Sequence, residues 1–127
     1  MDNLKLIAPA IIESIENWLE IKAATSTLAS NTRVAYHNDV TDFFIFLSEH
    51  HNEITQLSTV EKLKISDIRA WQAKLRNMNS GARSNARKLS SLKSYIRWLA
   101  KHRGFDATHI LSIKSPKFSN KLPRPLE

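Results

Sequence analysis

The segment that most constrains the fold runs from Ser80 to Gly104 and reads SGARSNARKLSSLKSYIRWLAKHRG. Its apolar residues recur at steps of three and four positions, which is the spacing of a single buried stripe along an α-helix. The members of this stripe are Leu89, Leu92, Ile96 and Leu99. The segment is therefore predicted to form one long helix with one side in a hydrophobic core.

The opposite side of this helix carries long basic and short hydroxyl side chains and no carboxylate. Its members are Arg83, Arg87, Ser91, Ser94 and Lys101. An ordinary solvent-facing side mixes both signs of charge, because Glu and Lys one turn apart stabilise a helix and keep it soluble. A side that is cationic throughout predicts that this helix lies against a polyanion.

The distribution of charge along the chain supports that expectation. The net charge is +7, but residues 1–59 contain three basic and eight acidic residues, whereas residues 60–127 contain sixteen basic and four acidic ones. Such asymmetry gives a folded domain one cation-rich surface, which attracts an anionic polymer and binds it through counterion release. The charge distribution alone is also consistent with a basic protein that has no specific partner.

Composition narrows the class of protein. A chain of 127 residues that is 42% hydrophobic suits a single globular domain. The absence of cysteine excludes disulfides and thiolate metal sites, and it fits a reducing compartment. No apolar run reaches the roughly 18 residues that span a bilayer, and the N-terminus lacks the pattern of a signal peptide. We therefore expect a cytoplasmic protein that does not enter a membrane.

Three further helices are predicted from apolar periodicity and from their end signals. They run from Pro9 to about Lys22, from Asn31 to about His50, and from Asp67 to about Met78. Ser30 and Ser66 are the expected N-caps of the second and third of these helices. Gly104 is expected to end the long basic helix in a left-handed conformation. Trp18 is expected in the core. Residues 50–53 are expected to close the second helix, and a loop is expected to run from there to about Ile65.

The composition changes near the C-terminus, after a short helical segment from Ala107 to about Ile113 that Asp106 is expected to cap. Three of the four prolines lie within residues 116–127, beside several basic residues, and proline at this density prevents a helix. No segment alternates with a period of two for long enough to predict a sheet. We therefore expect an all-α domain over residues 1–113 and an extended basic linker over residues 114–127, leading to a further domain.

The sequence contains no recognisable active site. Gly81 and Gly104 are the only glycines, so there is no glycine-rich phosphate loop, and there is no thiol nucleophile. The serines lie outside the strand–turn–helix context that activates a nucleophile. His50 and His51 are adjacent and would point about 100° apart on a helix, where they cannot readily share a metal ion. We expect no catalysis, metal or cofactor in this part of the protein.

The N-terminal end of the second predicted helix offers a second group of phosphate-binding side chains. Thr32, Arg33 and His37 fall in its first turns, where backbone N–H groups are also available. Hydroxyl, guanidinium and backbone N–H groups are the usual ligands of phosphate oxygens. The alternative is an ordinary capped helix end at the surface.

Several motifs together resemble one known family. They are S-N-T-R-x-x-Y from Ser30 to Tyr36, F-x-x-F-L from Phe43 to Leu47, A-R-S-x-A-R-K-L-S-S-L-K-S-Y-I-R-W-L from Ala82 to Leu99, P-K at residues 116 and 117, and L-P-R-P-L from Leu122 to Leu126. In this order and spacing they resemble the N-terminal core-binding domain of tyrosine recombinases and integrases. The resemblance is greatest to the bacterial Xer enzymes of chromosome-dimer resolution, in particular the XerC branch, and it spans nearly the whole chain.

The resemblance implies a fold and a set of DNA contacts. In this family the N-terminal domain is an orthogonal, SAM-like bundle of four main helices that clamps duplex DNA together with a second domain. Its second and fourth helices lie toward the major groove of the recombination half-site. The contacts implied for this sequence are Thr32, Arg33 and Tyr36 on the second helix, and Arg83, Ser84, Arg87, Lys88, Ser91 and Ser94 on the fourth.

The resemblance also implies a division of labour between domains. The family's strand-cleaving tyrosine and its arginine, lysine and histidine partners belong to a C-terminal catalytic domain that this sequence lacks. The parent enzyme would form a 3′-phosphotyrosyl intermediate without a metal or cofactor, and this part would bind DNA. Four protomers of such enzymes meet in a tetrameric synapse, where the first helix is expected either to contact a neighbouring protomer or merely to cover the core.

Two other functions remain open at this stage. The same domain also occurs in integrases of phages and mobile elements, and this sequence hardly separates the two kinds of enzyme. A helical protein-interaction module, whose basic helix binds an acidic partner, is an alternative of a different class. The salt dependence of DNA binding would distinguish that alternative from a recombinase domain.

Overall fold

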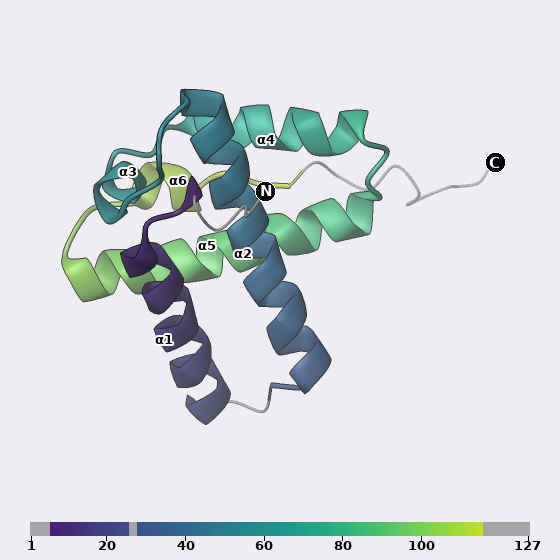
Figure 1. The fold of residues 1–127 in the computed structure, drawn as a ribbon. Coiled ribbons are helices and arrows are strands. Elements are labelled where there is room, and N and C mark those ends of the chain that lie inside the picture. Colours follow the sequence, from purple (N-terminus) through teal and green to yellow (C-terminus); the bar gives the residue numbers. More distant parts are fainter. Residues whose placement is uncertain (1–5, 26–27, 116–127) are drawn as a thin grey trace.

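The computed structural model describes residues 6–25 and 28–115 of the 127-residue chain. Within these ranges the structure is all α-helical, as predicted, and contains six helices. They are α1 (Pro9–Thr25), α2 (Ser30–His51), α3 (Leu57–Glu61), α4 (Ile65–Asn77), α5 (Ala82–Arg103) and α6 (Thr108–Leu111). The four predicted main helices are α1, α2, α4 and α5, with α1 and α2 running across α5 (Figure 1).

The crossing of α2 and α5 forms the centre of the hydrophobic core, and these two helices share the most extensive contact in the bundle. The predicted apolar stripe of α5 is confirmed, because none of its four residues is more than 2% exposed. Phe43, Phe44 and Leu47 of α2 are fully buried opposite it. The rings of Phe44 and Tyr95 meet edge to face with centroids 5.7 Å apart, which is a favourable aromatic geometry. This crossing fixes which side of α5 remains accessible.

Helix α1 covers the crossing from one side and begins at Pro9, as predicted. Trp18 is 3% exposed, so its expected place in the core is confirmed. The Ser14 hydroxyl lies 2.6 Å from the phenol oxygen of Tyr95, which ties α1 to α5. Burial raises the pKa of Tyr95 to about 12, because the ionised phenol would lose its hydration.

The expected starts of α2 and α4 were wrong by one and two residues, respectively. Ala29 is the N-cap of α2, and Ser30 is already helical. Lys64 is the N-cap of α4, so Ser66 lies inside the first turn, and the side chain of Asp67 accepts a hydrogen bond from the Lys64 backbone N–H at 3.0 Å. Asp67 had been expected in this first turn, where a carboxylate also interacts favourably with the helix dipole.

The predicted loop between Glu53 and about Ile65 contains a short helix that the sequence pattern did not predict. Helix α3 has only five residues, of which Val60 is buried in the core. The segment before it forms a single parallel bridge between Ile7 and Thr55. These contacts tie the start of α1 to the segment between α2 and α4.

The C-terminal end of α5 follows the prediction. Gly104 has a φ of 77°, and its backbone N–H bonds to the carbonyl of Ala100. The N-cap of the short helix α6 is Ala107 and not Asp106 as expected, although the carboxylate of Asp106 accepts hydrogen bonds from the backbone N–H and the hydroxyl of Thr108, the first residue of α6. The predicted linker from residue 116 onward lies outside the described residues.

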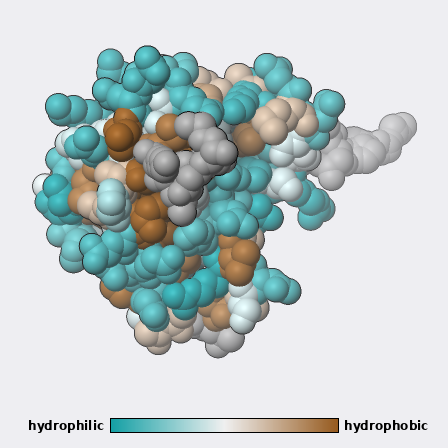
Figure 2. All heavy atoms as spheres, in the orientation of Figure 1, coloured by the Kyte–Doolittle hydropathy of each residue, from teal (hydrophilic) through white to brown (hydrophobic). Residues whose placement is uncertain are grey.

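The face of the molecule seen in Figure 2 is mostly polar. Hydrophilic side chains predominate on this face, and hydrophobic ones gather in small separate patches. The large hydrophobic side chains that are exposed come from different elements: Ile21, Val34, Ile54, Ile65 and Met78. Charged and hydroxyl groups therefore offer the stronger indication of a binding site.

Candidate nucleic-acid interface

A surface hollow lies between α1, the N-terminal half of α2 and the middle of α5. It is lined by Lys22, Tyr36, Arg87, Ser90, Ser91, Ser94 and Arg97. Three of these described lining residues are cationic, three are serines, and none is acidic. We call this the cationic hollow. Its donors are those that bind phosphate oxygens in nucleic-acid complexes.

Arg87 is the lining residue of the cationic hollow that pairs with a buried carboxylate. Its Nε donates to Oδ2 of Asp39 at 3.0 Å and its Nη2 donates to Oδ1 at 2.7 Å, in a bidentate pair between α5 and α2. This hydrogen bonding raises the pKa of the Arg87 guanidinium above its usual value. The side chain of Arg87 nevertheless remains 45% exposed, whereas that of Asp39 is 1% exposed.

The pairing with Asp39 corrects one expectation. Helix α5 itself presents no acidic residue on this side, but α2 supplies a carboxylate beneath Arg87. The positive charge of Arg87 is therefore partly balanced within the protein. Three donors of its guanidinium are not used by Asp39, so Arg87 can still bind an anion from the exposed side.

Ser91 lies deeper than expected for a DNA contact. It is 3% exposed, and its hydroxyl lies 3.0 Å from Oδ2 of Asp39 and 3.0 Å from the carbonyl oxygen of Arg87. A serine on α5 commonly bonds to the carbonyl one turn earlier. The buried hydroxyl of Ser91 therefore hydrogen-bonds to Asp39 and to the backbone of Arg87 beneath the surface. Ser90 and Ser94 are the more accessible serines of the cationic hollow.

Lys88 points to the other flank of α5. Its ammonium lies 3.6 Å from Oδ1 of Asp39, and its side chain is 19% exposed. It lines a separate groove between α2 and α4, beside Phe46, Trp71 and Met78. Lys88 and Arg87 thus flank the same buried carboxylate but face different surfaces.

The predicted residues of α2 lie beside the acidic side of α1. Arg33 is 3.8 Å from Glu20, and His37 is 3.3 Å from Glu16. Exposed pairs of this kind contribute about 0–1 kcal/mol and are weakened by salt, so they leave Arg33 able to exchange partners. Thr32 is half-buried in the same first turn of α2.

Tyr36 has a structural role in addition to its place in the cationic hollow. Its ring stacks on Trp18, with centroids 6.3 Å apart and planes 24° apart. The ammonium of Lys22 lies 6.0 Å from the centre of the same ring. Tyr36 therefore joins the core to the rim of the hollow and helps to place a cation there.

Arg83 and Ser84 lie in the first turn of α5, one turn before Arg87. Arg83 is exposed and Ser84 is half-buried. Neither lines the cationic hollow, so the structure brings together Tyr36, Arg87, Ser91 and Ser94 but leaves these two beside it. A ligand longer than a single phosphate is needed to reach them all.

Three lining residues were absent from the sequence-based set: Lys22, Ser90 and Arg97. Ser90 and Arg97 continue the three- and four-residue spacing of Arg87 and Ser94 along α5, so the sequence did contain a signal for them. Lys22 belongs to α1, and only the folded arrangement brings it to the hollow.

A second groove continues from the cationic hollow along α5. Lys22, Ser94 and Arg97 line both, and Trp18, Ile21, Trp98 and Lys101 complete the second. The Trp98 ring stacks on His102 with centroids 5.0 Å apart. The accessible side of α5 thus presents cations from Arg87 to Lys101, a length of about 21 Å at 1.5 Å per residue.

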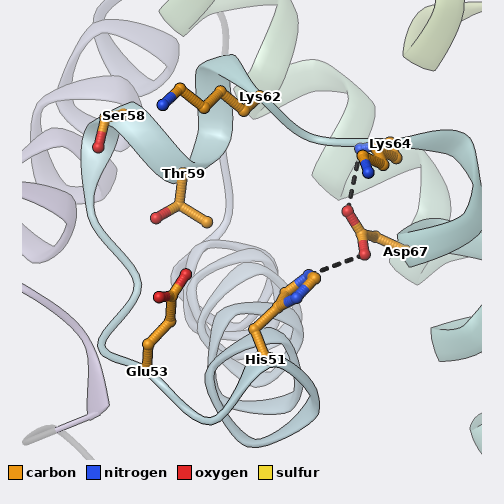
Figure 3. A pocket seen from close by; sticks show the side chains of 7 residues that line it. All are labelled: His51, Glu53, Ser58, Thr59, Lys62, Lys64 and Asp67. Atoms are coloured by element: carbon orange, nitrogen blue, oxygen red, sulfur yellow. Dashed lines mark hydrogen bonds and ion pairs between the residues drawn. The ribbon is translucent and has the colours of Figure 1, made fainter.

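A different hollow at the C-terminal end of α2 has mixed charge. It is lined by His51, Glu53, Ser58, Thr59, Lys62, Lys64 and Asp67 (Figure 3). His51 Nε2 lies 2.9 Å from Oδ1 of Asp67, whose other oxygen accepts the backbone N–H of Lys64. These groups satisfy one another and hold α2 and α4 together. Among the residues that the structure describes, no three His, Asp or Glu side chains form a group suited to a metal ion.

Comparison with known proteins places this geometry in context. The family model of the phage integrase N-terminal SAM-like domain matches residues 15–103, which include all of α2 to α5 and the greater part of α1. Among curated proteins, the tyrosine recombinase XerC of Brucella suis biovar 1 (strain 1330) is 32% identical over 98% of this chain and 40% of its own length. The tyrosine recombinase XerC of Rickettsia typhi (strain ATCC VR-144 / Wilmington) is 33% identical over 92% of this chain and 38% of its own length.

The chain spans about two fifths of the length of these curated relatives. No solved structure matches it significantly. Of the helices in the described ranges, none is long and apolar enough to cross a membrane.

Proposed function

Because this chain belongs to the phage integrase N-terminal SAM-like domain family, we propose that it is the part of a site-specific tyrosine recombinase that binds duplex DNA. The observation that carries the proposal is the cationic hollow, where helices distant in sequence bring three cations and three serines together without an acidic lining residue. Clustered cations on one face are the electrostatic footprint of a nucleic-acid-binding protein.

The proposed contacts follow the position of each side chain. Arg87, Ser94 and Tyr36 meet the duplex at the cationic hollow, and Thr32, Arg33, Arg83 and Ser84 meet it on either side. Lys88 contributes positive potential from the neighbouring flank. Ser91 acts through Asp39 and Arg87, because it is almost completely buried. Lys22, Ser90 and Arg97 are added to the set as phosphate contacts.

In the whole enzyme, a catalytic domain linked to this one would cleave and rejoin the DNA through a phosphotyrosyl intermediate. The similarity to XerC over nearly the whole chain favours a Xer-type recombinase that acts in chromosome-dimer resolution and assembles as a tetramer on two DNA sites. A protein with this role works in the cytoplasm, where the chromosome lies. An integrase of a phage or mobile element is the second candidate, since the matching family includes such enzymes.

Salt titration of duplex binding tests the proposal. The 127-residue chain is added to a fluorescein-labelled duplex of random sequence, and binding is followed by fluorescence anisotropy. If the five arginines and lysines proposed to meet the duplex each neutralise one phosphate, log affinity should fall linearly with log salt with a slope of about −4 to −5. These residues are Lys22, Arg33, Arg83, Arg87 and Arg97. A slope near zero, or no binding at low salt, would contradict the proposal.

A pair of charge-removing variants locates the site. Arg97→Ala is expected to reduce the magnitude of the salt slope by about one, because it removes one phosphate contact. Arg69→Ala removes the same charge from α4, which does not line the cationic hollow, and should leave the slope nearly unchanged. If the two variants changed the salt slope equally, the duplex would bind outside the cationic hollow.

The recombinase type is tested by competition. Unlabelled duplex carrying the host chromosome's recombination half-site should displace the random-sequence probe better than an equal amount of scrambled duplex. Equal displacement by the two competitors would argue against Xer-type site recognition by this domain.

A further inference from the structure

Asp39 is a fully buried carboxylate directly beneath a surface that is proposed to bind a polyanion. Its side chain is 1% exposed. Arg87 Nε and Ser91 Oγ each lie 3.0 Å from Oδ2, while Arg87 Nη2 lies 2.7 Å and Lys88 Nζ 3.6 Å from Oδ1. Burying a charge is costly unless it is paired and hydrogen-bonded, and Asp39 satisfies both conditions.

The atoms that Asp39 uses determine which part of Arg87 remains available. A guanidinium has five N–H donors in a rigid planar fork. Asp39 takes the edge formed by Nε and one N–H of Nη2. The other edge, formed by Nη1 and the second N–H of Nη2, keeps two parallel donors. Such a pair matches two phosphate oxygens or the O6 and N7 acceptors of guanine.

We propose that Asp39 is a positioning residue for DNA recognition, which holds the guanidinium of Arg87 so that its second edge faces the duplex. This inference rests on the proposed function. An arginine whose fork is already fixed loses less rotational freedom when it binds, so it discriminates better between acceptors than a freely moving one. Ser91 contributes by holding Asp39 in place.

The positioning role of Asp39 and the simple repulsion between its carboxylate and DNA predict opposite effects of Asp39→Asn on DNA affinity. A carboxylate near DNA repels phosphates, so electrostatics alone predicts that Asp39→Asn strengthens binding. Positioning predicts that Asp39→Asn weakens binding, because the neutral amide no longer holds Arg87 as firmly. The sign of the change therefore separates the two explanations.

Asp42 offers a matched control on the same helix. It follows Asp39 by three residues on α2, is exposed, and lines the groove on the other flank of α5 together with Lys88 and Lys74. Asp42→Asn removes the same charge from nearly the same place without touching the partners of Arg87. It is expected to leave binding unchanged or to strengthen it slightly.

The experiment compares the unmodified 127-residue chain with Asp39→Asn, Asp42→Asn, Arg87→Lys and Arg87→Ala, using the random-sequence duplex and a duplex selected from that pool for tight binding. We expect Asp39→Asn to weaken binding of the selected duplex about tenfold, at the low end of the range for a bidentate arginine contact. Arg87→Lys, which keeps the charge but loses the fork, should lose a similar factor. Asp39→Asn should have little further effect in an Arg87→Ala background, because it acts through Arg87.

A second measurement keeps the inference testable if Asp39→Asn unfolds the chain. In ¹⁵N NMR spectra of the unmodified chain, the Arg87 Nε–H signal should be visible and protected from exchange with water. On addition of the selected duplex it should stay protected while the Nη signals shift. A purely structural pair would show no shift of the Nη signals, and loss of Nε–H protection would show that DNA replaces Asp39 as the partner; either result overturns the inference.

Different experimental results would contradict this inference and the proposed function. If the unmodified chain binds no duplex, both the proposed function and this inference are contradicted. If the unmodified chain binds duplex and Asp39→Asn binds it equally well or better, only the positioning role of Asp39 is overturned.

Discussion

Replacing Tyr95 by phenylalanine is expected to change how the stability of the domain depends on pH. The phenol group of Tyr95 is buried at the crossing of α1, α2 and α5, and its oxygen lies 2.6 Å from the Ser14 hydroxyl. Phenylalanine keeps the ring and removes only this hydroxyl. Ser14 retains a hydrogen bond to the carbonyl of Ile11 at 2.7 Å, so the variant leaves no unsatisfied donor on Ser14.

The size of this pH effect on the stability of the domain follows from the pKa of Tyr95, which burial raises from 10.0 to about 12. In the unfolded chain the phenol ionises near pH 10, whereas in the folded chain it stays protonated until about pH 12. The stability that this difference contributes is fully present below pH 10 and is lost as pH rises through about 12. Between these two pH limits the unmodified chain loses about 3 kcal/mol of folding stability, at 1.36 kcal/mol for each unit of pKa.

Urea denaturation of both proteins across this pH range measures the effect. Near pH 8 the unmodified chain should be more stable by about 1 kcal/mol, the usual value of one buried hydrogen bond. Near pH 12 the order should reverse, because only the unmodified chain carries the Tyr95 phenol, whose pKa falls to its ordinary value on unfolding. Taking the difference between the two proteins cancels other groups that titrate in this range. Parallel stability curves would refute the burial of an un-ionised phenol at this position.

Two further predictions concern the backbone and the core. Gly104→Ala should destabilise the domain by about 1 kcal/mol, because Gly104 has a φ of 77° that an L side chain rarely adopts. Gly81→Ala serves as its control and should cost less than Gly104→Ala, since the space around Gly81 is open and its φ of −67° suits an L side chain; its one disadvantage is that Gly81 is the N-cap of α5, where glycine is preferred to alanine. Leu92→Ala should cost about 2–5 kcal/mol in chemical denaturation, because Leu92 is fully buried at the helix crossing; a loss below 1 kcal/mol would contradict that packing.

The main helices could be predicted from the sequence because their apolar periodicity is strong. The stripe of α5 and the ending at Gly104 each depend on residues close together in the chain, and the structure confirms both. Helix α3 was missed because five residues are too few to show a period, and it forms where Val60 packs into the core. The N-caps were misplaced because Ala29 and Lys64 occupy those positions without a capping side chain that propensity would favour.

The candidate site could be predicted only in part, because it depends on how helices cross. The basic and hydroxyl side of α5 was visible in the sequence. The pairing of Asp39 with Arg87 joins residues 48 positions apart, and no local pattern indicates it. The same crossing buries Ser91 and brings Lys22 to the rim. Side-chain periodicity tells which residues share a helix face, but the neighbouring helix decides which of them stay accessible.

The most direct test of the account is NMR chemical-shift mapping of the 127-residue chain during titration with a duplex that carries its recombination half-site. Backbone and side-chain shifts should concentrate on residues 83–97 of α5 and residues 32–36 of α2, around the cationic hollow. Shifts confined to α4, α6 and the hollow around His51, with residues 83–97 unchanged, would contradict the account.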